Sequence, residues 1–367
     1  MIVEGRTDVR DRLLRVLTVA LVTAAGAAPD VGASGVVVAQ VPGATGLTAY
    51  AGHVVWSQPD PATGRWRLMQ RHDGRVTRLA VGSRRVSFDA DAGPDARGHP
   101  VVVYSRCRHE PPYVYYTAPD WSLASGCDLY ETSLVHGTTQ RIRAVSTRAA
   151  SETTPSIWRG SIAFARRGPR SPFARLLLYD RVHHRISVLA GGTEHADARR
   201  PSSRSGAPSA LDLGPRAVAF NWLLDDPLAG GNDGREWQLW IVSRRSGRSR
   251  ELDTGLIGEC GSVLLNSPNA VGLGAEWIAS SNACGMDGGI HEYSDIVSYH
   301  WSRGETTHVR TDPFGVALTR DGATEWLLST PGVPQVDYPS GQAIPVDPGT
   351  CVGPGLSCSL VRVTGAP

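Results

Sequence analysis

The residues best suited to bind a ligand lie in long connecting segments that are rich in aromatic and acidic side chains. Flat aromatic rings beside carboxylates suit sugar rings or a peptide segment. The same side chains would also serve to pack the loops down, with the acids facing water, and the sequence leaves both interpretations open. The candidate binding residues are Tyr113, Tyr115, Tyr116, Trp121, Trp222, Asp225, Asp226, Trp237 and Tyr293.

Catalysis by paired carboxylates is the alternative to simple binding. Glycoside cleavage uses two carboxyl groups that face each other across the substrate, and Asp225, Asp226 or Glu236 could face Glu110 or Asp120 in this way. The alternative function is therefore a carbohydrate-active hydrolase or lyase with carboxylates at a central mouth.

Other catalytic and metal-binding motifs find little support. The chain has no Gly-x-Ser-x-Gly nucleophile motif, and neither His-Glu pair continues to a histidine at the zinc-protease spacing. Asp89 and Asp91 suggest calcium, but an EF-hand loop starting at Asp89 requires glutamate where Pro100 stands. Turn-forming aspartates are favoured over a calcium site. We expect no metal and no cofactor, assign no catalytic residue, and favour a non-enzymatic protein.

These segments are positioned by short strands that recur along the chain. An apolar strand preceded by a tight turn comes round six times, at residues 54–56, 102–104, 162–164, 218–220, 277–279 and 326–328. Each repeat adds a strand before that turn and two strands joined by a second tight turn after it. No helical periodicity interrupts the series. The pattern predicts an all-β fold, a six-bladed β-propeller of four-stranded antiparallel blades.

The turn and strand motifs also resemble those of a known family. Pro94-Asp95-Ala96-Arg97-Gly98 stands ahead of an apolar strand, as Asp321-Gly322 does, and residues 161–164 read Ser-Ile-Ala-Phe. This resembles the WD-like repeats of TolB-type propellers from bacteria, over roughly residues 45–346. Repeats one, four and five depart from the turn motif, and TolB's amino-terminal domain has no counterpart. The resemblance implies a propeller that serves as a binding platform or as an appendage of an enzyme.

Alternating turns divide the predicted blades into two faces. The turns between first and second strands, and between third and fourth, lie at one end, which we call the tight-turn face. The loops between second and third strands and the blade connections lie at the other end, the long-loop face. Because long loops on a rigid scaffold commonly carry function, we expect the ligand on the long-loop face. The main loops are residues 105–126, 166–174, 221–237 and 281–294.

The first residues predict export. Residues 1–28 place arginines before a short apolar run that ends in small residues, the layout of a secretory signal peptide. The 6 cysteines fit an oxidising compartment better than a zinc site. Since neighbouring cysteines fall within one repeat, we expect three disulfides, although sequence allows other connectivities. The expected pairs are Cys107–Cys127, Cys260–Cys284 and Cys351–Cys358.

The sequence also predicts the domain organisation, and its charge balance limits the kinds of partner. The chain has 37 basic and 35 acidic residues, and this nearly balanced charge does not favour binding to nucleic acid. We predict a signal peptide (1–28), an N-terminal segment with a possible closing strand (29–45), the propeller (46–350) and a C-terminal tail (351–367). Residues 36–39 and 359–363 are candidates for the closing strand, and the first is favoured. The expected protein is a secreted, periplasmic or envelope monomer without a transmembrane segment, whose partner is a protein or polysaccharide.

Overall fold

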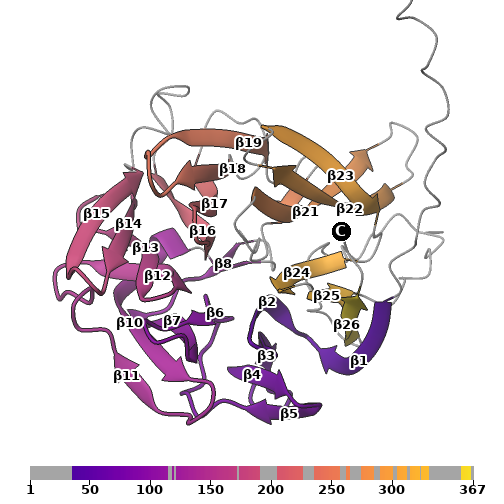
Figure 1. Ribbon diagram of the computed structural model, residues 1–367, viewed down its shortest axis with the longest axis horizontal. Coiled ribbons are helices and arrows are strands. Elements are labelled where there is room, and N and C mark those ends of the chain that lie inside the picture. The colour runs from indigo at the N-terminus through magenta and orange to yellow at the C-terminus, as the bar shows by residue number, and fades with distance from the viewer. Residues whose placement is uncertain are drawn as a thin grey trace, which may run out of the picture.

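The protein is built from antiparallel β-strands (Figure 1). The computed structural model describes residues 35–114, 118–119, 121–171, 173–190, 205–225, 235–256, 262–264, 274–284, 290–300, 304–311, 315–322, 324–329 and 357–364. The predicted signal peptide lies outside these residues.

Five sheets of four strands each use strands that follow one another in the chain. The first contains β2 (Thr45–Tyr50), β3 (His53–Pro59), β4 (Trp66–His72) and β5 (Arg75–Arg78). The second contains β6 (Asp91–Pro94), β7 (Pro100–His109), β10 (Ser125–Ser133) and β11 (Thr139–Arg141). The third contains β12 (Ser151–Trp158), β13 (Ser161–Arg167), β14 (Arg175–Asp180) and β15 (Arg185–Ala190).

The last two of these sheets complete the consecutive series. The fourth contains β16 (Ser205–Leu213), β17 (Ala217–Asp225), β18 (Arg235–Ser243) and β19 (Ser249–Leu256). The fifth contains β20 (Ser262–Leu264), β21 (Gly274–Cys284), β22 (Ile290–His300) and β23 (Glu305–Thr311). All five are antiparallel and surround a common centre, so they are the blades of a β-propeller (Figure 1).

The two ends of the described chain form a composite sheet. Its strands run in the order β1 (Gly35–Pro42), β26 (Ser357–Thr364), β25 (Thr324–Ser329) and β24 (Gly315–Asp321). Both candidate closing segments are thus used, β1 pairing with β26 and β26 with β25. Of the six blades predicted, five are found as units of consecutive strands. The composite sheet differs from them, since its outer strand β1 comes from the opposite end of the chain.

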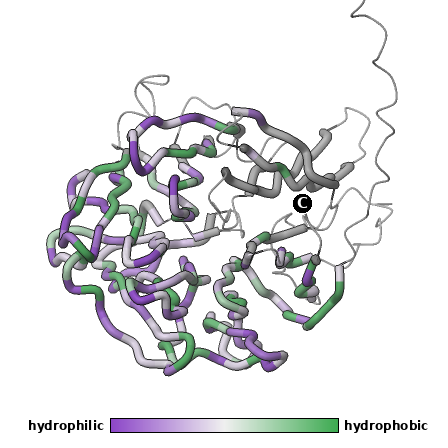
Figure 2. The backbone as a smooth tube through the Cα atoms, in the orientation of Figure 1, coloured by the Kyte–Doolittle hydropathy of each residue, from purple (hydrophilic) through white to green (hydrophobic). Residues whose placement is uncertain are grey.

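The middle strands of the blades are buried on both faces. In β7, Val101 to Tyr104 are all at most 4% exposed, and in β13 the segment from Ile162 to Ala165 is fully buried. Such continuous apolar runs fit strands covered by a neighbouring blade on each side. The outer strand β5 is exposed along its length and hydrophilic, whereas the edge strand β1 is hydrophobic (Figure 2).

One buried carboxylate joins the inner strands of adjacent blades. Asp91, on β6, accepts hydrogen bonds from Thr48 Oγ1 on β2 at 2.8 Å and from Ser156 Oγ on β12 at 2.6 Å. It also accepts the Ile157 N–H at 2.9 Å. Ser156 Oγ in turn accepts the Leu213 N–H from β16 at 2.7 Å. This chain of hydrogen bonds therefore links four consecutive blades near the centre.

Burial dominates the electrostatics of Asp91. Loss of solvent raises its pKa to about 6 against the opposing effect of the hydrogen bonds from Ser156, Ile157 and Thr48. The sequence favours a turn-forming role for Asp91. That interpretation is wrong, because Asp91 lies in β6 and its partners come from other blades.

We predict that Asp91→Asn weakens the pH dependence of stability between about pH 4 and 6. The wild-type carboxyl binds its proton more tightly when folded, at a pKa of about 6, than when unfolded, near 3.8. Its contribution to the free energy of unfolding is therefore full below pH 4 and declines as pH rises through 6. Urea midpoints across this range for wild type and variant measure the difference. An unchanged slope would assign the titration to another group, and Asp73→Asn, at an exposed carboxylate, is the control.

Candidate functional site

The best-described part of the long-loop face is the base of the loop between β7 and β10. This loop carries a small ribbon of β8 (Tyr113–Val114) and β9 (Ala118–Pro119), followed by the 3₁₀ turn η2 (Trp121–Leu123). Cys107 and Cys127 are directly opposite each other on β7 and β10 and form a disulfide. The prediction of this pair is confirmed, and the disulfide fixes both ends of the loop to one blade.

The other predicted disulfides are only partly within the described residues. Cys358, on β26, is disulfide-bonded, and Cys284 is the last residue of β21. Cys260 and Cys351 lie outside the described residues, so those two pairings stay predictions.

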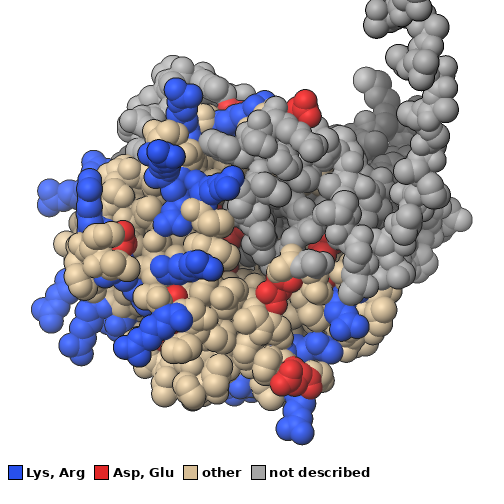
Figure 3. Space-filling model, viewed as in Figure 1, with Lys and Arg blue, Asp and Glu red and all other residues tan. Residues whose placement is uncertain are grey.

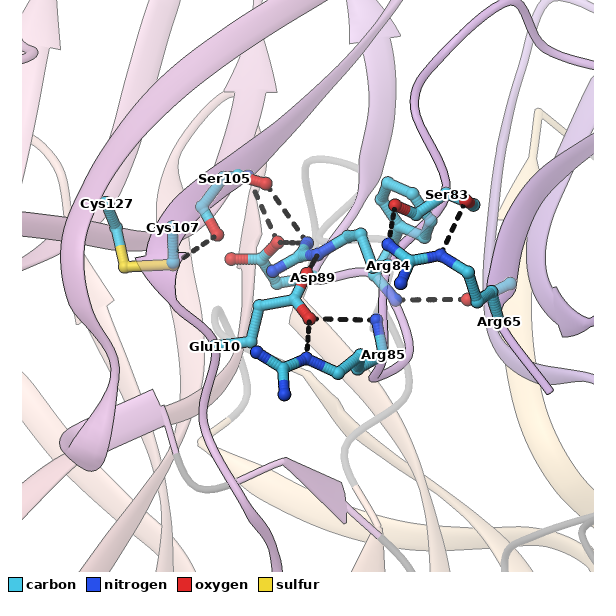
Figure 4. A network of polar contacts seen from close by, with 11 residues as sticks. Arg65, Ser83, Arg84, Arg85, Asp89, Ser105, Cys107, Glu110 and Cys127 are labelled. Atoms are coloured by element: carbon cyan, nitrogen blue, oxygen red, sulfur yellow. Dashed lines mark hydrogen bonds and ion pairs between the residues drawn. A yellow bond between two sulfur atoms is a disulfide. The ribbon is translucent and has the colours of Figure 1, made fainter. Parts of the chain in front are cut away.

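A buried arginine organises the polar contacts beneath the loop (Figure 4). The side chain of Arg84 is 4% exposed, and its Nη1 donates to the Ser105 carbonyl at 3.0 Å and to Asp89 Oδ1 at 3.2 Å. Its guanidinium carbon lies 4.9 Å from the ring centre of Phe88 and 5.0 Å from that of Trp121. A planar cation can stack on aromatic rings while bonding at its edge. Arg84 therefore contacts both the aromatic rings and the polar groups at the base of the loop.

The two carboxylates around Arg84 are bound to backbone as well as to arginine. Asp89 accepts the N–H of Ser105 at 3.0 Å and, through its other oxygen, the N–H of Thr154 at 2.8 Å. Glu110 accepts the Arg85 N–H at 2.8 Å and lies 3.6 Å from Arg84 Nε. Both acids are thus occupied by structural contacts. Glu110, which was considered for glycoside cleavage, points toward Arg84 (Figure 4).

The loop base is also tied to the next blade. Arg167 Nη2, on β13, donates to the Ala124 carbonyl at 2.9 Å, and the Gly126 N–H donates to Ser151 Oγ on β12 at 2.9 Å. Thr154, which bonds to Asp89, has a φ of 45°, an uncommon conformation for a β-branched residue. A register shift in β12 between Thr153 and Ser156 accompanies it. The irregular backbone turns the Thr154 N–H toward the neighbouring blade.

A second buried ion pair lies on the same end of the third blade. Glu152 is completely buried and accepts from Arg166 Nε at 3.0 Å and from the backbone and hydroxyl of Thr147. Burial raises the pKa of Glu152, although the contacts with Thr147 and Arg166 oppose the shift. Arg166 also donates to the Val145 carbonyl at 2.7 Å. The pair thus fixes the connection that enters β12.

Two of the predicted binding residues are placed in the interior. Trp121 is 5% exposed and packs with Val86 and Ala124, and Trp222 is fully buried beside Phe220. Both side chains therefore pack the protein in this arrangement and do not present an open ring to solvent.

The remaining predicted binding residues fall where side chains are not described. Tyr113, Asp225, Trp237 and Tyr293 lie in β8, β17, β18 and β22. Tyr115, Tyr116 and Asp226 lie outside the described residues. Ligand binding by the whole set stays a prediction.

Sequence reasoning missed Arg84 and the bridging role of Asp89. Arg84 belongs to no repeat strand and was therefore given no role. One available signal is the nearness of the arginine pair at 84 and 85 to the acids at 89 and 91, which suggests an ion pair. Within the described part of the chain, no group of three or more metal-ligating side chains gathers. Across the same residues, no helix has the length and apolar character needed to cross a membrane.

Comparison with known proteins yields only distant structural likenesses. No family model matches the sequence, and no curated protein matches it. Solved structures with a similar fold include TolB from Acinetobacter baumannii, at 11% identity over 86% of this chain, with a TM-score of 0.41. The chain spans 65% of that TolB and 62% of a putative TolB from Agrobacterium tumefaciens.

Two enzymes show comparable likeness. An oligogalacturonate lyase from Vibrio parahaemolyticus is 10% identical, covering 83% of this chain and 76% of the lyase, with a TM-score of 0.44. A gluconolactonase from Xanthomonas campestris is 13% identical, covering 90% and 89%, with a TM-score of 0.47. At these identities the likenesses carry no argument about function.

We predict that Arg84→Met destabilises the protein far more than Arg85→Met. Removing the Arg84 guanidinium leaves Asp89, 1% exposed, and Glu110, 16% exposed, without their buried cation, which should cost about 3–5 kcal/mol. Arg85 is 78% exposed, so losing its ion pair should cost less than about 1 kcal/mol. Urea unfolding of both variants measures the contrast. Equal losses would contradict the role assigned to Arg84.

Proposed function

We propose that the protein is an exported, non-catalytic binding propeller that recognises a protein or glycan through its long-loop face. The observation that carries this proposal is that the carboxylates at the base of that face form ion pairs and hydrogen bonds within the protein. Among the described residues, Asp89, Glu110 and Glu152 are each bound by an arginine and by a backbone N–H. Acids that must cleave a glycosidic bond face the substrate instead. Of the acids considered for cleavage, Glu110 is the one whose side chain is described, and its pairing with Arg84 supports a platform for binding.

The anchoring of the loop supports the same proposal. The Cys107–Cys127 disulfide holds its two ends, Arg84 holds its base, and Arg167 ties it to the third blade. A surface held in place before the ligand arrives loses less conformational entropy on binding. The long loop is thus suited to present the tyrosines predicted at 113, 115 and 116.

We further propose that the protein acts outside the reducing cytosol. The signal-like residues 1–28 and the disulfide-bonded state of Cys107, Cys127 and Cys358 support this. Disulfides form and persist mainly in oxidising compartments.

We also propose that the composite sheet serves as the sixth blade and closes the ring. Its Trp326, Leu328 and Leu360 share a core with Leu47 and Trp56 of the first blade. The Asp321 carboxylate accepts the N–H groups of Ala51 and Gly52 at 3.0 and 2.5 Å. These contacts support direct packing of the composite sheet against the first blade.

The proposed function is tested by a glycan array and an envelope-protein pull-down with the exported protein. We predict that replacing Tyr113, Tyr115 and Tyr116 together by serine abolishes binding and leaves thermal stability unchanged. These positions are better probes than Trp121, because truncating a buried tryptophan would destabilise the loop. Val135→Ser, in an exposed turn of the opposite face, is the control.

The outcomes separate the two functional classes. Binding lost only in the tyrosine variant supports a long-loop binding face. Binding lost equally in Val135→Ser would contradict it. Release of reducing sugar ends from a bound polysaccharide would overturn the non-catalytic proposal and favour the hydrolase or lyase alternative.

A further inference from the structure

The tight-turn face contains a hollow of about 480 Å³ that belongs to neither the long loops nor the network around Arg84. It lies where the third and fourth blades meet. The β12–β13 turn supplies one wall, the β16–β17 turn another, and the residue after β18 a third. The lining residues are Trp158, Arg159, Ser161, Pro215 and Arg244.

Arg244 is held firmly at one side of this hollow. Its Nη1 donates to the carbonyls of Gly214 and Pro215 at 3.0 and 3.4 Å, and its Nη2 donates to Ser161 Oγ at 2.8 Å. These contacts use three of the five guanidinium N–H groups. Among the described residues, the Nε–H and one Nη2–H have no hydrogen-bond acceptor. Both are donors that an anion can accept from.

Neither arginine of the hollow forms a direct ion pair with a described carboxylate, although Asp180 lies near enough to attract the charge of Arg244. Within the described part of the chain, no carboxylate lies within 4.0 Å of the charged nitrogens of Arg159 or Arg244. Nearby Arg181, by contrast, pairs with Glu131 at 2.6 Å. Arginines also outnumber acids over β12–β15 on the visible face in Figure 3. Two guanidinium groups thus line one hollow, and among the described residues no carboxylate pairs directly with either.

Arg159 occupies a turn position that favours other residues. Its φ is 46° and that of the following Gly160 is 77°, the combination of a type I′ hairpin turn. Asn or Asp is favoured at the first position of such a turn, because their short polar side chains tolerate positive φ. Gly160 is required at the second, since a Cβ there would lie 2.9 Å from the Cβ of Ala96. An arginine at position 159 is therefore less favourable for the backbone of this turn than Asn or Asp would be, and it places a positive charge at the hollow.

Trp158 adds a flat apolar wall. The residue is partly exposed, and its ring meets that of Tyr50 edge to face, with centres 6.5 Å apart. The indole thus lines the same hollow as the two arginines. A ligand that fits both would combine an anionic group with a flat or ring-shaped organic part.

We propose that this hollow binds a small organic anion. Its carboxylate or phosphate accepts hydrogen bonds from Arg159 and Arg244, and its ring lies against Trp158. The site is independent of the proposed long-loop function, because it lies at the other end of the blades.

The probes are phenyl phosphate, benzoate, inorganic phosphate and the neutral benzyl alcohol, titrated calorimetrically against the full protein. We expect saturable binding of phenyl phosphate and benzoate and none of benzyl alcohol. Binding of phenyl phosphate no tighter than inorganic phosphate would overturn the ring contact. Absence of binding by both aromatic anions would overturn the proposal.

The decisive variant is Arg159→Asn. Asparagine restores the residue that the turn favours, so thermal stability should be unchanged or higher. Loss of one charge-assisted contact should weaken phenyl phosphate binding about tenfold. Arg75→Asn, an exposed arginine beside another tight turn of the same face, should leave the affinity unchanged. An Arg159→Asn variant with wild-type affinity would overturn the role of Arg159, and an equal loss in Arg75→Asn would show a general charge effect only.

Discussion

The hydrogen bonds that converge on Asp91 are the interaction on which the rest of the structure depends. Each blade buries its flat faces against its neighbours, but apolar packing alone leaves the rotation and height of a blade loosely defined. The Asp91 carboxylate and the Ser156 hydroxyl accept from or donate to specific atoms on β2, β12 and β16. A buried polar network is favourable only when its partners are in place. It therefore fixes the inner strands of four blades in one mutual arrangement.

Within that arrangement, Arg84 and Arg244 lie on opposite faces of the propeller and have different kinds of partner. On the long-loop face, charges are paired and buried, as Arg84 with Asp89 and Arg166 with Glu152 show. On the tight-turn face, Arg181 also forms an ion pair, with Glu131, but Arg244 bonds to neutral carbonyls and a hydroxyl. The ion pairs of Arg84 and Arg166 hold chain segments together. The contacts of Arg244 leave its positive charge available to a ligand.

The fold could be predicted from the sequence because its strands are local and repetitive. The apolar runs at Val102 and Ile162 lie in β7 and β13 as expected, and Cys107 pairs with Cys127 within one repeat. The roles of Asp89 and Asp91 could not be predicted in the same way. Their partners Thr154, Thr48 and Ile157 lie 65, 43 and 66 residues away, and local turn preferences say nothing about such distant contacts. Likewise, Trp121 resembles a surface aromatic until Arg84 is found against its ring.

The pairing of β1 with β26 has a consequence for the order of assembly. Gln40 and Ser359, which join these strands, are 319 residues apart, so β1 leaves the ribosome long before its partner exists. Until then its backbone edge and the exposed Val36 and Val37 are open to wrong pairing. The blades between them can form earlier from consecutive strands. Pairing of β1 with β26 is thus a late, long-range step of folding.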